Sequence, residues 1–363
     1  MISYNCNKQS NIKFTTKGDI MEKAGNQPEL NSYEEKKIAI KYWLQGKAEN
    51  DPAYYNVLKS LDKVMRYSDE FSGDSMSANF SRQIELMKNK ISLGSQEEIE
   101  DDFEDDFVNN DSELNNYQKK KLAIKFWLIG KSEDDPSYCN CVKAMELAVR
   151  YHNGFRKDHV TPEFQHQIEI ISNIRTSVKD LMRPADTITV AFLHDVVEDY
   201  GINAKYWTTQ KERLVGLKPV KLEFIESHFG KDVADAVNKI SKMADGVTKG
   251  KEEYFQGISE CPMASIAKLE DRCNNMDSML NVFTLEKQIS YAREVVEHFL
   301  PMLKKANKNF PEQESAYMRF KNVLTSQVKG VNNMAAIFDA EDMDIKQVPI
   351  VAAQERKKKR MGL

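Results

Sequence analysis

Residues 184–201 read PADTITVAFLHDVVEDYG, an apolar stretch that carries a histidine and three acids near its end. Its apolar side chains recur at the i, i+3, i+4 and i+8 spacing of a buried helical stripe. They are Ile188, Ala191, Phe192 and Val196. The pattern predicts one complete helix, with Asp186 as its N-cap and Gly201 as its C-terminal stop.

The same stretch carries side chains that a core helix does not need. His194 and Asp195 are adjacent, so on one helix they project about 100° apart and could both reach an ion at its edge. Glu198 and Asp199 follow one turn later. Burying these groups is costly unless they coordinate or titrate. The alternative is an exposed acidic helix end, but there the acids would crowd the negative end of the helix dipole.

The composition limits the class of protein. A chain of 363 residues with net charge −4 is long enough for one large or two ordinary domains and has no nucleic-acid signature. No apolar run approaches the roughly 18 residues of a membrane span, and the N-terminus lacks a signal-peptide core. We therefore expect a soluble, cytoplasmic protein with no membrane partner and no specific nucleic-acid partner. Its five cysteines are unevenly spaced, which argues against a disulfide framework.

A segment of the chain is duplicated. Residues 31–47 read NSYEEKKIAIKYWLQGK and residues 115–131 read NNYQKKKLAIKFWLIGK, an offset of 84 residues (117 minus 33) that continues without a gap to about Glu169. The copies differ in their polar residues. Ser68, Ser72, Gly73 and Arg82 stand in the first copy where the second has His152, Arg156, Lys157 and His166.

The first copy has therefore kept its packing residues and lost its polar ones. We predict that it forms an inert helical module without metal ligands. Its apolar face needs a cover, and either the catalytic domain of the same chain or the equivalent face of a second subunit, in a homo-oligomer, could provide one.

Strand-like alternation is almost absent, so the predicted fold is all-α. We predict five regions along the chain. They are a flexible leader (1–30), the degenerate repeat (31–92), an acidic linker (93–113), a catalytic domain (114–310), and a C-terminal helix with a basic tail (311–363).

A metal site needs ligands from more than one helix. His166 lies in Phe164–Ile171, directly before a buried stripe, and Asp271 interrupts an amphipathic helix. With His194 and Asp195 they would supply two imidazoles and two carboxylates. Such a mixed set suits manganese, iron or zinc better than calcium or magnesium.

The chain resembles the HD-domain hydrolases of the RelA/SpoT type over about residues 140–306. The resemblance rests on five motifs in the same order. They are Tyr151–Lys157, His166, Leu193–Asp199, Phe229–Gly230, and Lys268–Arg272 with Asn275 and Met276. Members of that family remove the 3′-pyrophosphate from guanosine tetra- and pentaphosphate alarmones with a manganese ion. The resemblance therefore implies an HD-type helical bundle, a nucleotide substrate, and manganese or another divalent transition metal as cofactor.

The resemblance also implies roles for individual residues. The family's metal ligands match His166, His194, Asp195 and Asp271. Its acidic pair, which serves the catalytic water, matches Glu198 and Asp199. Substrate-binding positions match Arg156, Lys157 and Asn275, and Arg272 is either a further source of positive charge or a structural ion-pair residue.

The chain departs from the family pattern in two places. Glu270–Met276 lacks a histidine that the family carries, and Asp245–Lys249 stands seven residues later than the family's spacing from Phe229–Gly230 requires. The exact substrate is therefore open. The alternatives are another nucleotide phosphohydrolase, such as a 5′-nucleotidase or an NADPH phosphatase, and a nucleotide-binding protein without turnover.

Overall fold

Most of the described chain is helical. The computed structural model describes residues 33–49, 54, 58, 114–156, 159–204, 207, 214, 216–280 and 282–340. The strands among them are β1 (Met243–Ala244) and β2 (Val247–Thr248), which pair antiparallel. The all-α prediction is confirmed. No helix in this part of the chain is both long enough and apolar enough to cross a membrane.

The contacts between residues divide the chain into two units, with the boundary between Val142 and Lys143. The first unit holds α1 (Tyr33–Ala48), α4 (Asn116–Asp134) and the first turn of α5 (Tyr138–Tyr151). The catalytic domain was predicted to begin at residue 114. In the structure, α4 belongs to the same unit as α1, and the second unit begins at Lys143. The predicted leader, the acidic linker, most of the first copy and the basic tail lie outside the described residues.

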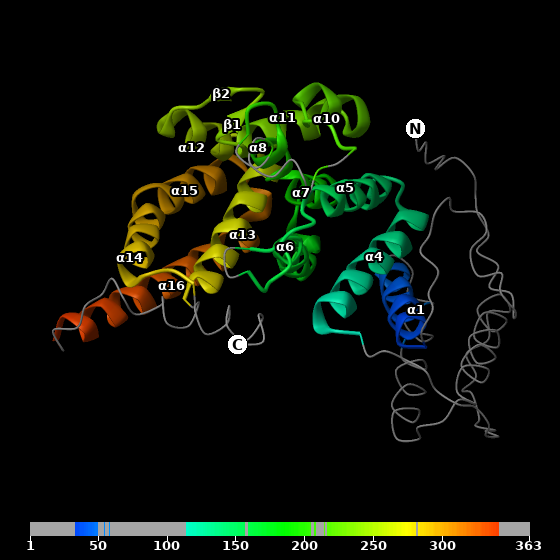
Figure 1. Ribbon diagram of the computed structural model, residues 1–363, viewed down its shortest axis with the longest axis horizontal. Helices are drawn as coiled ribbons and strands as arrows, with labels where there is room; N and C mark the ends of the chain where they lie inside the picture. Colours follow the sequence, from blue (N-terminus) through cyan, green and yellow to red (C-terminus); the bar gives the residue numbers. More distant parts are fainter. Residues whose placement is uncertain are drawn as a thin grey trace, which may run out of the picture. The chain divides into compact units, whose positions relative to one another are not determined.

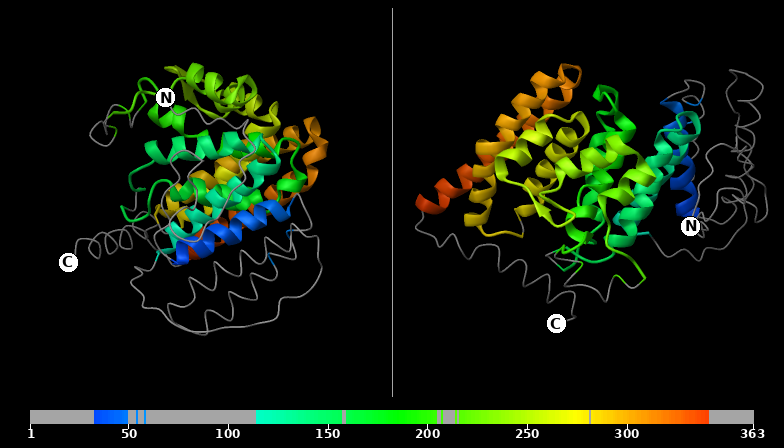
Figure 2. Two further views of the ribbon diagram at one scale, coloured as in Figure 1. Left: turned by 90° about the vertical axis from the view of Figure 1, so that its right-hand side faces the viewer. Right: turned by 90° about the horizontal axis from the view of Figure 1, so that it is seen from above.

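In the first unit, α4 begins where a capping box predicts a helix start. The Asn115 side chain accepts from the Gln118 backbone N–H (2.9 Å), and the Gln118 side chain accepts from the Asn115 N–H (2.9 Å). From there α4 packs along α1, so the corresponding helices of the two copies lie side by side (Figures 1 and 2).

The second unit is a bundle around α13 (Pro262–Met279). This helix is buried on nearly every side, as expected of a helix at the centre of a core. It contacts α6, α7, α11 and α12 as well as α14, α15 and α16, and Figure 1 shows it with α6 and α7 on one side and α14 and α15 on the other. The surrounding helices are α6 (Gln165–Arg175), α7 (Pro184–Leu193), α8 (Val196–Tyr200), α10 (Leu222–Phe229), α11 (Lys231–Ile240), α12 (Lys251–Ser259), α14 (Leu285–Glu294), α15 (Leu300–Asn309) and α16 (Glu314–Ala340). Short 3₁₀ turns lie at Val178–Asp180 and Pro311–Gln313.

Residues 184–201 do not form the single helix predicted from their periodicity. α7 ends at Leu193 and α8 begins at Val196, so His194 and Asp195 occupy the break between them. The His194 ring lies 2.7 Å from the Ala191 carbonyl oxygen, which a continuous helix would pair with the amide of Asp195. The break therefore coincides with the chemistry of the stretch.

The predicted N-cap of this stretch was also wrong. α7 begins at Pro184, whose missing N–H costs nothing in the first turn of a helix, and its N-cap position is Arg183. Asp186 lies inside the first turn and accepts hydrogen bonds from the Arg183 guanidinium. The predicted stop is confirmed, because α8 ends directly before Gly201.

Two further irregularities lie at Gly230 and before Pro301. Gly230 separates α10 from α11 with a φ of 90°, a backbone conformation that favours glycine. Before Pro301, the helix that starts at Leu285 changes to a π-helical segment (Val295–Phe299) and then continues as α15. A proline has no backbone N–H, so one hydrogen bond of the helix is lost, and a π-helical segment lets the chain continue as a helix past that position.

The stacked rings of Phe164 and Phe192 connect the start of α6 to α7. Their centroids are 6.2 Å apart with an interplanar angle of 9°, and both side chains are almost fully buried. We expect Phe192→Ala to lower the free energy of unfolding by about 3–5 kcal/mol, because it leaves a cavity in the core. Denaturant unfolding followed by circular dichroism measures this change. Val247→Ala on the exposed strand β2 is the control, and an equal loss in both variants would contradict the packing described.

Candidate metal centre

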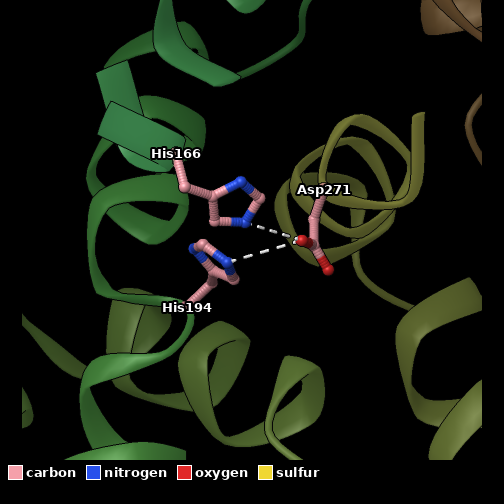
Figure 3. A group of neighbouring side chains, drawn as sticks. All are labelled: His166, His194 and Asp271. Carbon is pink, nitrogen blue, oxygen red and sulfur yellow. Dashed lines mark hydrogen bonds and ion pairs between the residues drawn. The ribbon is translucent and has the colours of Figure 1, made fainter. Parts of the chain in front are cut away.

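Three side chains from separate segments converge in the core of the second unit. His166 lies on α6, His194 follows α7, and Asp271 lies in the middle of α13. One ligand atom from each lies within 4.8 Å of the other two, and all three residues are buried. Nε2 of His166 is 3.0 Å and Nε2 of His194 is 3.7 Å from Oδ1 of Asp271. Figure 3 shows both rings directed at this carboxylate.

Asp195, the fourth predicted ligand, lies at the rim of this cluster. Its Oδ2 atom is 2.9 Å from Nε2 of His194, and 29% of its side chain is exposed, against 7% for Asp271. The four predicted ligands are therefore close together, with one carboxylate at the edge of the core and the other inside it.

The outer nitrogen of each imidazole is held by an oxygen. Nδ1 of His166 lies 2.6 Å from Oδ1 of Asn274, and Nδ1 of His194 lies 2.7 Å from the Ala191 carbonyl. Because oxygen acceptors on Nδ1 favour the proton there, each imidazole in its neutral form directs the lone pair of Nε2 toward the cluster. This arrangement is typical of metal-binding histidines.

Asn274 is a supporting residue that the sequence analysis missed. It occupies the position where the family that the sequence resembles carries a histidine. Its amide nitrogen donates to Glu169 (3.1 Å), and its oxygen lies 2.6 Å from Nδ1 of His166. Its spacing of three residues from Asp271, which puts both on one face of α13, is the signal that could have found it.

These residues fit a divalent ion. Nε2 of His194 is buried and has no hydrogen-bond partner among the described residues, although the oxygen of Asp195 is near. A cation bound by both Nε2 of His194 and Oδ2 of Asp195 would account for two such atoms that lie close together without a hydrogen bond. With two nitrogens and two carboxylate oxygens, the donor set suits manganese, iron or zinc.

The charges of the cluster are strongly coupled. Burial acts to lower the pKa of His194, but the negative charges of Asp195 and Asp271 outweigh it and raise that pKa to about 9. Burial acts to raise the pKa of Asp271, but Lys268 and the two histidines hold it well below its usual range. Because a ligand imidazole must be neutral, an ion competes with a proton for His194, and its affinity should fall as the pH falls.

Asn275 links the cluster to Arg156. Asn275 donates from Nδ2 to Oδ1 of Asp271 (2.6 Å), and its own oxygen accepts from Nη2 of Arg156 (3.2 Å). Two of the predicted substrate-binding residues therefore lie within two hydrogen bonds of Asp271. Lys157, the third, lies outside the described residues.

The acidic pair on α8 is divided between two environments. Oε2 of Glu198 accepts from the backbone N–H of Lys242 (2.7 Å), which fixes this carboxylate. Burial raises the pKa of Asp199 well above its ordinary value, and the charges of Asp195, Glu198 and Glu163 act in the same direction. Their roles toward a catalytic water stay a prediction.

Arg272 has the contacts of a structural residue. Its Nη2 donates to Glu294 (2.6 Å), and its guanidinium carbon lies 4.8 Å from the Tyr291 ring centroid and 4.2 Å from that of Phe299. Only 7% of the residue is exposed. These contacts connect α13 to the helix that begins with α14, and they favour the ion-pair alternative over the substrate-binding one.

No protein-family model matches the chain. It is 26% identical over 181 residues to a Synechocystis protein named probable guanosine-3′,5′-bis(diphosphate) 3′-pyrophosphohydrolase, covering 48% of this chain and 21% of that protein. It is 25% identical over 198 residues to the Aquifex aeolicus guanosine-3′,5′-bis(diphosphate) 3′-pyrophosphohydrolase, covering 53% and 25%. It is 24% identical over 194 residues to the Brucella ovis GTP pyrophosphokinase rsh, covering 53% and 24%. The chain thus spans a quarter or less of the length of these relatives.

Loss of a single ligand should abolish metal binding. We expect the wild-type chain to retain one divalent ion through gel filtration, and His194→Ala or Asp195→Ala to lose it, because each variant removes a donor from the cluster. Elemental analysis of the eluted protein measures this. His228→Ala, which removes an exposed imidazole stacked on Phe224, is the matched control. Full metal content in both ligand variants would contradict the assignment of this metal site.

Proposed function

We propose that this chain is a metal-dependent hydrolase that removes the 3′-pyrophosphate from guanosine tetra- and pentaphosphate alarmones. The observation that carries the proposal is the buried cluster of His166, His194 and Asp271, whose ligand atoms approach within 4.8 Å. The names of two distant relatives support the substrate class, since one is named a guanosine-3′,5′-bis(diphosphate) 3′-pyrophosphohydrolase and the other a probable one.

The proposed ligands are His166, His194, Asp195 and Asp271, and the proposed ion is manganese or another divalent transition metal. When bound, such an ion supplies positive charge to a phosphate oxygen and lowers the pKa of a water molecule. The two carboxylates balance its charge. Asn274 and the Ala191 carbonyl hold the imidazoles in the required tautomer.

The acidic pair moves the proton in this proposal. Asp199 lies one turn after Asp195, and its amide donates to the Asp195 carbonyl (2.8 Å). Glu198, held by the Lys242 amide, adds negative charge beside it. We assign Asp199 as the proton acceptor and Glu198 as the group that orients it or the water.

The reaction conserves its atoms and charges. A water oxygen attacks the phosphorus nearest the ribose, and the bond from that phosphorus to the 3′ oxygen breaks. The proton lost by the water passes to Asp199, and the 3′ oxygen takes up a proton as it leaves. The products are pyrophosphate and guanosine 5′-diphosphate or 5′-triphosphate.

Arg156, Lys157 and Asn275 hold the nucleotide in this proposal. The Arg156 guanidinium can stack on a base or pair with phosphate, and its hydrogen bond to Asn275 ties it to the residue that contacts Asp271. Arg272 is given no part in substrate binding here, because its guanidinium forms an ion pair with Glu294.

A panel of nucleotides tests the function. We expect the purified chain with manganese to release pyrophosphate from guanosine tetraphosphate and to leave 5′-nucleotides and NADPH unchanged. Chromatography of the products separates pyrophosphate from orthophosphate release. Orthophosphate from a 5′-nucleotide or from NADPH would identify another phosphohydrolase, and bound nucleotide without turnover would identify a binding protein. Either outcome would overturn the proposal.

Removing either carboxylate of the acidic pair should separate rate from metal content. We expect Asp199→Asn and Glu198→Gln to lower kcat by about 100- to 10,000-fold, the usual contribution of a general base, while bound metal stays at the wild-type level. Steady-state kinetics and elemental analysis on the same preparation measure both.

Glu226→Gln, on the exposed face of α10, is the control for removing one acid from the surface. If metal content and rate fell in proportion in Asp199→Asn, Asp199 would be a ligand and its assigned role would be wrong.

A further inference from the structure

The two copies of the repeat meet through a reciprocal contact between α1 and α4. At the crossing, a Cβ added to Gly46 would collide with the backbone carbonyl oxygen of Trp127, and a Cβ added to Gly130 would collide with that of Trp43. Gly46 and Gly130 are equivalent positions of the repeat, and so are Trp43 and Trp127. Each helix thus offers a glycine to the same part of the other, and the two approach as closely as backbones can.

The polar contacts around this crossing are reciprocal as well. Trp43 donates from Nε1 to Glu133 (3.0 Å), and Trp127 donates from Nε1 to Glu49 (2.9 Å). Lys47 lies 3.4 Å from Glu133, and Lys131 lies 3.3 Å from Glu49. Every one of these residues sits 84 positions from its counterpart.

The aromatic contacts repeat the pattern. Trp43 meets Tyr54 edge to face, with centroids 6.2 Å apart, and Trp127 meets Tyr138 in the same way at 6.2 Å. Lys47 lies over the Tyr54 ring and Lys131 over the Tyr138 ring, at 5.4 and 5.1 Å. The first unit is therefore organised like a two-fold symmetric pair built from one chain.

Such reciprocity defines an isologous interface, in which the same patch serves on both sides. We propose that the α4 face, formed by Trp127, Gly130, Lys131 and Glu133, is a self-association surface, and that α1 covers it in place of α4 from a second copy of this chain. When α1 leaves, two chains pair through α4.

One asymmetry favours α4 as the half that pairs with itself. Lys47 also reaches Oδ1 of Asp134 at 2.5 Å, and the first copy has Asn50 at the equivalent position. In a pair of α4 helices, each Lys131 therefore faces two acids, Glu133 and Asp134. Against α1 it faces one, Glu49, because Asn50 replaces the second acid. The central contact between glycine and the tryptophan backbone would be the same in both pairs.

The test displaces α1 in the full chain and leaves α4 unaltered. In Gly46→Leu the new side chain meets the Trp127 backbone, which cannot move aside as a flexible side chain would. We expect the light-scattering mass of this variant to be about twice that of the wild type at the same concentration, and to return toward it on dilution. Gly330→Leu is the matched control, because a Cβ there meets nothing within 4 Å on α16 and the mass should not change.

The double variant Gly46→Leu/Gly130→Leu identifies the surface. It blocks α4 as well as α1, so its mass should equal that of the wild type. An unchanged mass for Gly46→Leu, or a doubled mass for the double variant, would overturn the proposal.

A second variant guards against misfolding. Lys47→Glu introduces no steric clash and sets like charges against Glu133 and Asp134, so it should release α1 and raise the mass in the same way. Circular dichroism checks that each variant keeps its helices. If Gly46→Leu lost its helical signal, Lys47→Glu would decide, and a wild-type mass for it would refute the proposal.

Discussion

A carboxylate buried in the middle of the central helix is the constraint on which the second unit depends. Asp271 is 5% exposed, and an unpaired charge there would cost several kcal/mol. Its two oxygens meet His166, Asn275 and Lys268, at 3.0, 2.6 and 2.8 Å. The first of these partners comes from α6, and His194 approaches from the end of α7. Satisfying one charge therefore fixes where two other helices stand against α13.

The same constraint explains the irregular backbone next to it. The His194 ring takes the oxygen that would have continued α7, and the chain restarts as α8 after Asp195. A regular helix would have kept the hydrogen bond between the Asp195 amide and the Ala191 carbonyl, but the His194 imidazole would then not be held where it is. Local irregularity is often retained where a functional group must be aimed, and here the break carries two of the four proposed ligands.

Periodicity and the placement of polar residues on apolar segments were enough to predict helices, the stop at Gly201, and the four residues that lie close together at the cluster. A histidine or a carboxylate on an apolar face stands out in any sequence. The break at His194 was not predictable. An apolar stripe indicates which face of a helix is buried, but it does not indicate which backbone carbonyl a side chain will hydrogen-bond. Asn274 was missed for a similar reason, since its partner is 108 residues away in the chain. α1, the described helix of the first copy, packs against α4 of the second copy with glycine facing backbone, and an apolar pattern alone does not identify such a partner.

The proposed site requires that residues of α6, α13 and the end of α7 bind one divalent cation together. Anomalous diffraction above the manganese edge, from crystals grown with manganese, locates that ion. We predict one strong peak within coordination distance of Nε2 of His166, Nε2 of His194 and Oδ1 of Asp271. The absence of a peak there while manganese is bound elsewhere on the chain would contradict the proposed site.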